Sequence, residues 1–305
     1  MLPWSAIILT MIEEISEGLY LVHGANKGRF PWSHSILAVG DSVVLFDTGC
    51  GAEATEEVKG RFKVDLVVNS HTHPDHFSCN HHFREYELWA PEMFASILPD
   101  LESMSRRLAG GGEPAREWLH LVREVLGHEP VAPTGTFWDG DVIDLGTLRF
   151  RAVHTPGHTA DHFCFLEEKT RTMLTFDIDL TPFGPWYGHV ESDLDQFCDS
   201  LHRVLELEPS MVVSSHRRPI VEGIAEEVAA FDAVFVRRNE RILGMLGKRP
   251  ATPEELAASS PIYGVPENDF VLARYFEARM VEKHLELLAR TGLAVRGEDG
   301  RYTSV

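Results

Sequence analysis

Four side chains that can bind a metal ion fall within six residues of this sequence: His71, His73, Asp75 and His76. Imidazole nitrogens and carboxylate oxygens are the ligands that zinc takes in hydrolytic sites, which keep one coordination position open for water. The alternation of His71 and His73 places both imidazoles on one face of an extended segment. Asp75 and His76 follow Pro74, where the chain bends, so they can serve a second ion nearby. This cluster predicts a metal site that performs hydrolysis.

Three further candidate ligands are spread along the chain: His158, Asp177 and His216. Each follows a short apolar run, as the first cluster follows residues 64–69. Continuous apolar runs of about four to eight residues are typical of strands buried on both faces. Because each candidate stands at the end of such a run, we expect all of them to project from the same edge of the fold.

The remaining pattern indicates which elements position these residues. Short runs rich in β-branched and apolar residues predict strands at residues 18–23, 34–39, 43–46, 64–69, 88–90, 148–154, 162–167, 172–176 and 211–215. The first three predict an antiparallel meander. Helical patterns at 91–127 and 193–206 separate the later strands. This order predicts an α+β fold with two β-layers and helices outside them, a four-layer αββα sandwich.

The sequence also predicts a division into segments. We expect a catalytic domain at residues 11–222, with a helical insertion at about 91–127 that the glycines at 110–112 break in two. A connecting helix follows at 223–247. Residues 248–305 then show a capping box that begins at Thr252, a helical pattern at 267–291 and a hairpin signal. Helices followed by a hairpin predict a small winged-helix-like module.

The arrangement of the candidate ligands resembles that of the metallo-β-lactamase superfamily. The pattern His-x-His-x-Asp-His at residues 71–76, followed by His158, Asp177 and His216, matches the metal-ligand motifs of that family in order. Asp47, in a Phe-Asp-Thr-Gly segment, matches a supporting motif. The resemblance covers about residues 17–222 and implies two divalent metal ions. Zinc is expected, and iron or manganese can also occupy His/Asp sites.

The resemblance implies a role for each ligand. One ion would be held by His71, His73 and His158. The second would be held by Asp75, His76 and His216, and Asp177 would bridge the two. Lactamases of the family usually have cysteine where this sequence has Asp177 or Asp75, so the pattern is more similar to that of glyoxalase II-like hydrolases. Relatives commonly have glycine where Phe176 stands, which we interpret as a local packing difference.

These assignments predict a reaction class. Two divalent ions about 3.5–4 Å apart can hold a bridging hydroxide at neutral pH. Asp75 would orient this nucleophile and pass a proton to the leaving group, which makes it the candidate catalytic residue. We therefore expect a hydrolase of a small ester, thioester or lactone. Two alternatives stay open: nucleic-acid processing through the C-terminal module, and a mononuclear iron sulfur dioxygenase.

Candidate substrate contacts follow the bridging aspartate. Residues 182–189 are dense in glycine and proline, which is typical of a shaped loop, and Trp186, Tyr187 and His189 can line a pocket there. The alternative is a packed surface loop with aromatic anchors. His162 can orient a ligand or serve as a buried structural histidine. Residues 30–32 precede a strand where relatives often have a loop over the cleft.

The C-terminal residues resemble the winged-helix tail of lactamase-β-2-like proteins, some of which act on RNA. Residues 248–305 contain 8 Lys+Arg and 9 Asp+Glu, so they offer no basic face to nucleic acid. The whole chain of 305 residues has a net charge of −19, which also disfavours polyanions and favours a small-molecule substrate. We expect the tail to pack on the core and wall the cleft.

Location and assembly are predicted from simpler features. No run reaches the about 18 apolar residues of a membrane span. Residues 1–12 lack the basic start of a signal peptide, and Met11 is an alternative start to Met1. The four scattered cysteines favour a reduced, cytoplasmic location. The apolar face of residues 91–127 must be buried, either as a lid on the cleft or in a homodimer, and we expect the homodimer.

Overall fold

The structure is a computed structural model that describes residues 10–247, 249–266 and 269–305. Met1 and most of the apolar opening lie outside the described residues, whereas the alternative start Met11 lies within them. The same holds for residue 248, where the predicted module begins, and for residues 267–268, where the predicted C-terminal helix begins.

Within the described residues, the first sheet has seven strands. In spatial order they are β1 (Ile12–Ser16), β2 (Leu19–Val22), β3 (Ser35–Val39), β4 (Val43–Phe46), β5 (Leu66–Val68), β6 (Glu87–Pro91) and β7 (Gly135–Phe137). β1 to β4 pair antiparallel, which confirms the meander, and β4 to β7 pair parallel. β1 and β7 were not predicted.

The second sheet has five strands in the described part of the chain. They are β8 (Val142–Asp144), β9 (Arg149–His154), β10 (Phe163–Glu167), β11 (Thr172–Phe176) and β12 (Met211–Ser214). β8 to β11 pair antiparallel, whereas β11 and β12 are parallel. Because β11 and β12 run in the same direction, the residues that follow them leave the sheet at the same edge.

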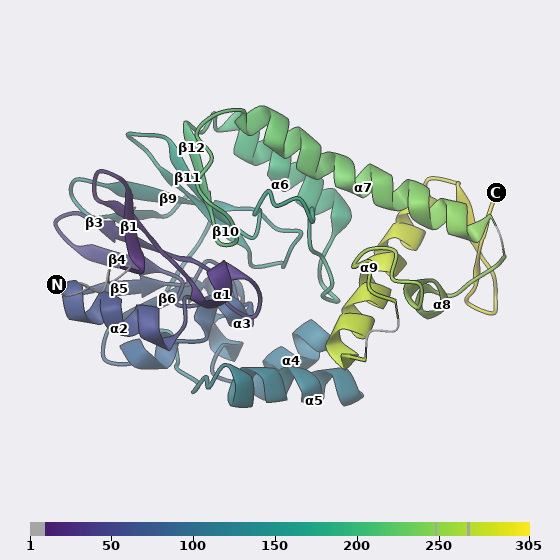
Figure 1. The fold of residues 1–305 in the computed structure, drawn as a ribbon, viewed down its shortest axis with the longest axis horizontal. Helices are drawn as coiled ribbons and strands as arrows, with labels where there is room; N and C mark the ends of the chain where they lie inside the picture. Colours follow the sequence, from purple (N-terminus) through teal and green to yellow (C-terminus); the bar gives the residue numbers. More distant parts are fainter. Residues whose placement is uncertain (1–9, 248, 267–268) are drawn as a thin grey trace, which may run out of the picture.

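Alternating side chains of the strands build the layers. In β3 and β4, Ile36 and Phe46 point into the core between the two sheets, with Phe150 and Phe165 of the second sheet. Their neighbours Leu37 and Leu45 pack on the other face, against helix α2 (Ala52–Arg61). Helices α6 (Leu194–Glu206) and α7 (Ile224–Leu246) cover the outer face of the second sheet (Figure 1). The mixed α/β architecture, with two packed sheets between helices, agrees with the predicted sandwich.

The helical insertion is present and is buried within the same chain. It comprises η2 (Glu92–Ile97), α4 (Leu101–Ala109), α5 (Gly112–His120) and the short π-turn η3 (Leu121–Val125). The break falls at the predicted glycines. Met104, Leu108 and Trp118 pack against Leu272 and Phe276 of helix α9 (Val271–Arg290) (Figure 1). The apolar face that motivated the homodimer is therefore covered inside the monomer, and the reason for expecting a dimer was wrong.

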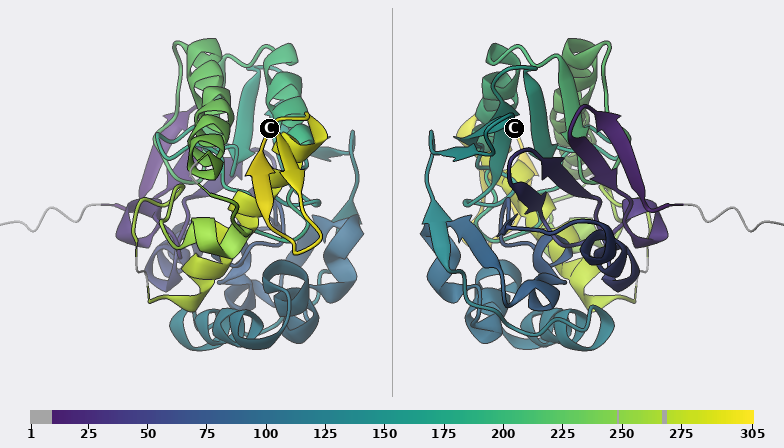
Figure 2. Two further views of the ribbon diagram at one scale, coloured as in Figure 1. Left: turned by 90° about the vertical axis from the view of Figure 1, so that its right-hand side faces the viewer. Right: turned by 90° about the vertical axis from the view of Figure 1, so that its left-hand side faces the viewer.

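The C-terminal residues form α8 (Pro253–Ala257), α9 and a hairpin of β13 (Ala294–Arg296) and β14 (Tyr302–Ser304). Thr252 makes the predicted capping box with Glu255. Figure 2 shows the hairpin at one end of α9 and the insertion helices at the other. Buried residues of α9 share one core with α6 and α7. A module boundary at residue 248 and the winged-helix likeness stay predictions.

Two further observations bear on the sequence-based expectations. All four cysteines lie in the described part of the chain and are free thiols. Among the described helices, none combines the length and the apolar composition required to cross a membrane.

Candidate metal centre

The predicted ligands lie where strands of both sheets end. His71 follows β5 of the first sheet, whereas Asp177 and His216 follow β11 and β12 of the second. Two backbone hydrogen bonds join the sheets at this edge: Phe163 donates to the carbonyl of Ser70 at 3.1 Å, and His34 donates to that of Ser215 at 2.7 Å. Segments distant in the sequence are thereby held side by side at one edge.

One carboxylate oxygen of Asp177 faces three imidazoles. Its Oδ2 lies 3.1 Å from Nε2 of His158, and 3.6 Å from both Nε2 of His71 and Nδ1 of His73. All four side chains are less than a tenth exposed. These are the residues that the resemblance assigned to the first ion and the bridge.

The other oxygen of Asp177 faces a second group. Its Oδ1 lies 2.9 Å from Nε2 of His76 and 3.3 Å from Nε2 of His216. Asp75 adds its Oδ2 at 3.7 Å from Nε2 of His76 and 3.5 Å from Nε2 of His216, and its Oδ1 lies 3.0 Å from Nδ1 of His73. Asp177 therefore stands between two clusters of donor atoms.

Most of these donor atoms lack a hydrogen-bond partner among the described residues. The buried atoms without such a partner are Nε2 of His71, Nδ1 of His73, Oδ1 of Asp75, Nε2 of His76, Nε2 of His158 and Oδ1 of Asp177. Buried polar atoms are nearly always satisfied in folded proteins, so a converging group without partners requires another interaction. Divalent cations fit this set because its nitrogen and oxygen donors are the ones such ions take.

The opposite ring nitrogens fix the orientation of four imidazoles. The Nδ1 atom of His71 donates to Oγ of Ser70 at 2.9 Å, and that of His76 donates to Oδ2 of Asp47 at 2.7 Å. The Nδ1 atom of His158 donates to the Trp186 carbonyl at 2.9 Å, and that of His216 donates to the Gly28 carbonyl at 2.6 Å. With the proton on Nδ1, the Nε2 lone pair is directed to the centre, which is the tautomer that a metal requires.

Asp47 lies behind the predicted ligands and contacts Ser70 and His76. This fully buried carboxylate accepts hydrogen bonds from the backbone and hydroxyl of Ser70, both at 2.7 Å, and from Nδ1 of His76. Gly49 lies directly against the turn α3 (Pro74–Phe77). A Cβ atom on residue 49 would lie 1.4 Å from the Asp75 carbonyl oxygen. Only glycine allows this approach.

The charges of the site shift its pKa values in opposite directions. Burial lowers the pKa of His71 well below 6.5. Burial opposes the charged form of His76 and His216 as well, but nearby carboxylates, Asp177 foremost, raise the pKa of His76 well above 6.5 and that of His216 to about 9. The same histidines hold the pKa of Asp177 well below 3.8 against its burial. The opposite shifts follow from the close packing of carboxylates and imidazoles in one buried group.

Phe176, which precedes Asp177, has a backbone conformation that favours glycine. Its φ is +46°, in the left-handed region, and its side chain is fully buried. The ring packs 6.1 Å from that of Phe165 and 6.4 Å from that of Phe46. The aromatic core therefore holds the strained turn that precedes Asp177.

His162 acts on the backbone beside the centre. Its Nδ1 lies 3.1 Å from the Thr155 carbonyl, and its Nε2 accepts a hydrogen bond from the Asp177 amide at 3.3 Å. Burial lowers its pKa to about 3. Both ring nitrogens are engaged, so His162 orients the Asp177 backbone as a buried, neutral histidine.

The three candidate substrate residues have different positions. Trp186 stacks on His73 with ring centroids 5.4 Å apart, and the His189 ring lies 5.0 Å from that of His73. Tyr187 lies instead in the C-terminal core, where its hydroxyl is 2.5 Å from Nε2 of His284 and 2.9 Å from Nη1 of Arg238. The loop thus brings Trp186 and His189 to the site and turns Tyr187 away from it.

Phe30 also stacks on His73, with ring centroids 6.0 Å apart, and Phe30 is 47% exposed. Together with Trp186 it gives the metal centre an aromatic border. Trp186 in turn donates from Nε1 to the hydroxyl of Tyr263 at 2.8 Å and packs on Phe276 of α9. The C-terminal residues therefore contact the border of the site.

Sequence reasoning missed Arg107 of α4, which donates a hydrogen bond to Oγ1 of Thr72, between His71 and His73. No motif surrounds it. The available signal was its place on the apolar face of the helix, three residues after Met104 and next to Leu108, where a charged side chain needs a buried partner.

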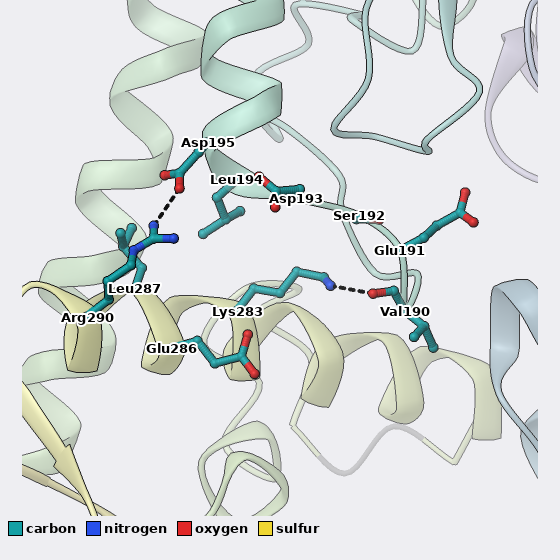
Figure 3. Close-up of a pocket in the computed structure, with 10 residues that line it drawn as sticks. All are labelled: Val190, Glu191, Ser192, Asp193, Leu194, Asp195, Lys283, Glu286, Leu287 and Arg290. Atoms are coloured by element: carbon teal, nitrogen blue, oxygen red, sulfur yellow. Dashed lines mark hydrogen bonds and ion pairs between the residues drawn. The ribbon is translucent and has the colours of Figure 1, made fainter.

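A hollow of about 280 Å³ lies between residues 190–195 and α9 (Figure 3). None of the predicted metal ligands lines it. Its two cationic side chains are engaged, since Lys283 donates to the Val190 carbonyl at 3.1 Å and Arg290 pairs with Asp195 at 2.6 Å (Figure 3). It is separate from the metal centre.

Comparisons with known proteins agree with this geometry. An atrochrysone carboxyl ACP thioesterase from Claviceps purpurea is 26% identical over 268 residues, which cover 83% of this chain and 74% of the relative. The lactamase-like protein ptaB from Pestalotiopsis fici is 27% identical over 178 residues, which cover 55% of this chain and 47% of the relative, about half its length.

Solved structures show the same fold. A metallo-β-lactamase family protein from Thermus thermophilus superposes with a TM-score of 0.74 at 22% identity, covering 96% of this chain and all of the other. A β-lactamase domain protein from Burkholderia ambifaria gives a TM-score of 0.72 at 20% identity, covering 99% and 96%. The sequence model of the metallo-β-lactamase superfamily matches residues 31–216. This chain therefore belongs to the metallo-β-lactamase superfamily and is a hydrolase of that fold.

Proposed function

We propose that the protein is a dinuclear metal-dependent hydrolase of small acyl substrates, and that among esters, thioesters and lactones its substrate is a thioester. The observation that carries the dinuclear assignment is the division of Asp177, whose two oxygens face separate groups of histidines. In this proposal His71, His73 and His158 hold one ion. Asp75, His76 and His216 hold the other, and Asp177 bridges them.

Zinc is the proposed metal, because the donors are nitrogen and oxygen atoms held in a rigid, buried set. Divalent ions here would supply Lewis-acid chemistry, polarising the carbonyl under attack and acidifying a water molecule. The protein supplies the orientation. Asp47 and Ser70 hold two of the imidazoles from behind, and His162 holds the backbone of the bridging residue.

Asp75 is the proposed proton carrier. Its carboxylate is 1% exposed, and its Oδ1 has no hydrogen-bond partner in the described part of the chain. Such an oxygen can accept a proton from the attacking water and deliver it to the leaving group. A thiolate leaving group needs little help from an acid, so a single carboxylate suffices for a thioester.

The border of the site favours an apolar acyl group. Phe30 and Trp186 present aromatic rings beside His73, and the partly exposed ring of Phe30 is available to a ligand. A relative named as an acyl-carrier thioesterase supports the same bond type. We propose that the C-terminal residues wall this side of the cleft, since Tyr263 and Phe276 contact Trp186.

The test combines metal analysis with a substrate panel. We expect purified protein to contain two zinc ions per chain and to release thiol from acyl-pantetheine thioesters, with activity lost on chelation and restored by zinc. Matched oxygen esters, lactones, a phosphodiester and a β-lactam serve as controls. One iron per chain with oxygen consumption on a persulfide would replace this proposal by the dioxygenase hypothesis, and RNA cleavage would replace it by nucleic-acid processing.

A further inference from the structure

The guanidinium of Arg107, on α4 of the helical insertion, joins two segments that carry predicted metal ligands from different parts of the chain. Its Nη2 lies 2.9 Å from Oδ1 of Asp161, and its Nε lies 2.6 Å from Oε2 of Glu191. Its Nη1 donates to Oγ1 of Thr72. The side chain is only 10% exposed, so these contacts are shielded from water.

The first segment is the loop between His71 and His73. Thr72 donates from its backbone amide at 3.1 Å and from its hydroxyl at 2.6 Å to Oδ2 of Asp161. Asp161 is fully buried, and Arg107 is its cationic partner. A buried carboxylate that loses such a partner is strongly destabilised. The anchor of Thr72 therefore depends on Arg107.

The second segment carries His158. Glu191 accepts a hydrogen bond from the Ala160 amide at 3.0 Å, and the neighbouring Ser192 donates to the His158 carbonyl at 2.6 Å. Figure 3 shows the carboxylate of Glu191 directed away from Lys283, on the far side from the hollow. Glu191 and Ser192 thus connect Arg107 to the backbone of His158 and Ala160.

The end of α4 holds the same region through a second contact. The carbonyl of Leu108 accepts a hydrogen bond from Nδ1 of His189 at 3.0 Å. This carbonyl is available because the last carbonyls of a helix have no partner within it. The guanidinium of Arg107 also lies 3.5 Å from the ring centroid of Phe94, which fixes its plane.

We propose that Arg107 is a positioning residue for the metal centre, which sets the spacing between the His71–His73 loop and the segment that carries His158. The proposal rests on the proposed function only in taking these histidines as metal ligands. It makes the helical insertion part of the active site. The competing explanation is a buried ion pair that stabilises the fold without affecting the metal.

Zinc affinity separates the two explanations without any substrate. Arg107→Ala, Arg107→Lys and the control Arg106→Ala would be titrated against a chelator of known zinc affinity. We expect Arg107→Ala to weaken zinc binding by about 10–100-fold, the usual effect of removing a partner behind a ligand. Arg107→Lys should recover part of the lost affinity, because lysine supplies the positive charge but not the planar set of several donors. Arg106 is exposed and should have no effect.

A second pair of variants guards against a folding defect. Thr72→Val keeps the shape of the side chain but removes the hydroxyl that meets Arg107 and Asp161, whereas Thr72→Ser keeps it. We expect weaker zinc binding in Thr72→Val and near-normal binding in Thr72→Ser. If Arg107→Ala and Thr72→Val are folded and bind zinc within twofold of wild type, the positioning role is wrong. A wild-type protein that binds no zinc would refute both this role and the proposed function.

Discussion

The metal edge, which is the edge of the two sheets that carries the predicted ligands, and the helical cover beside it are held together in different ways. At the edge, short turns between strands are fixed by backbone contacts, such as the Thr48 amide on the His76 carbonyl at 2.7 Å. In the cover, which comprises α4, α5, residues 182–192 and α9, contact with the site is made largely by single side chains such as Arg107 and Trp186. The edge is therefore rigid by construction, whereas the cover depends on individual residues.

Removing a ligand should break the edge completely. Asp177→Ala takes away both oxygens that stand between the two groups of histidines. We expect loss of bound metal together with a fall in kcat of at least about 10²–10³-fold, the scale at which a principal electrostatic group contributes. The exposed His202 provides the control, and His202→Ala should keep both metal and turnover. Metal retention by Asp177→Ala would contradict the bridging role.

The turn before Asp177 tests how the core supports the edge. Phe176→Ala should lower the free energy of unfolding by about 3–5 kcal/mol, because a buried ring is lost. Glycine usually destabilises more than alanine, but at φ +46° it relieves a conformation that costs about 1–2 kcal/mol. We therefore expect Phe176→Gly to be at least as stable as Phe176→Ala in denaturant unfolding. A Phe176→Gly variant that is less stable than Phe176→Ala would contradict the strain at this turn.

The pH dependence of the unfolding free energy should differ between the metal-free and the metal-loaded protein. The pKa of His216 is raised to about 9 from 6.5. Its contribution to the metal-free protein is fully present below pH 6.5 and is lost as the pH rises to about 9. A bound metal keeps the ring neutral and avoids this loss. The stabilisation by zinc should thus grow between pH 6.5 and pH 9, by up to about 1.4 kcal/mol per pH unit for each proton displaced. A difference that is flat with pH would contradict this linkage.

The smallest effect is expected in the cover. Tyr263→Phe removes the hydroxyl that accepts the Trp186 hydrogen bond. We expect a loss of about 0.5–1.5 kcal/mol in unfolding free energy, with zinc affinity unchanged. A raised KM for aromatic thioesters would sharpen the contrast by placing substrate recognition in the cover. A fall in zinc affinity would show that the contact between Tyr263 and Trp186, like Arg107, supports the metal site.

Sequence reasoning reached the edge because metal chemistry restricts residue types. The histidines and aspartates at residues 71–76, 158, 177 and 216 could be picked out by type and by their place after strands, and the structure brings all of them together. Asp47 was reached only through the resemblance of its Phe-Asp-Thr-Gly segment to a motif of the family. Their roles as ligands stay a proposal.

The cover was less predictable because nothing in the sequence fixes an irregular loop. Trp186 and Tyr187 are neighbours of the same class, yet one stacks on His73 and the other is buried against α7. The partner of the insertion, α9, lies more than 150 residues along the chain from α4. Without that pairing the apolar face suggested a dimer. β1, β7 and β8 were missed because β1 reads as polar and β7 and β8 are only three residues long.

The position of α9 between the insertion helices and α7 has a consequence for synthesis. The proposed ligands are complete once residue 216 has left the ribosome, and the turns of the edge need nothing further along the chain. α9 follows only at residues 271–290, and until then Met104, Leu108 and Trp118 lack the part of their core that Leu272 and Phe276 supply. During translation the nascent chain therefore exposes the apolar face of the insertion beside a formed metal edge, and this interval is when it most needs protection from aggregation.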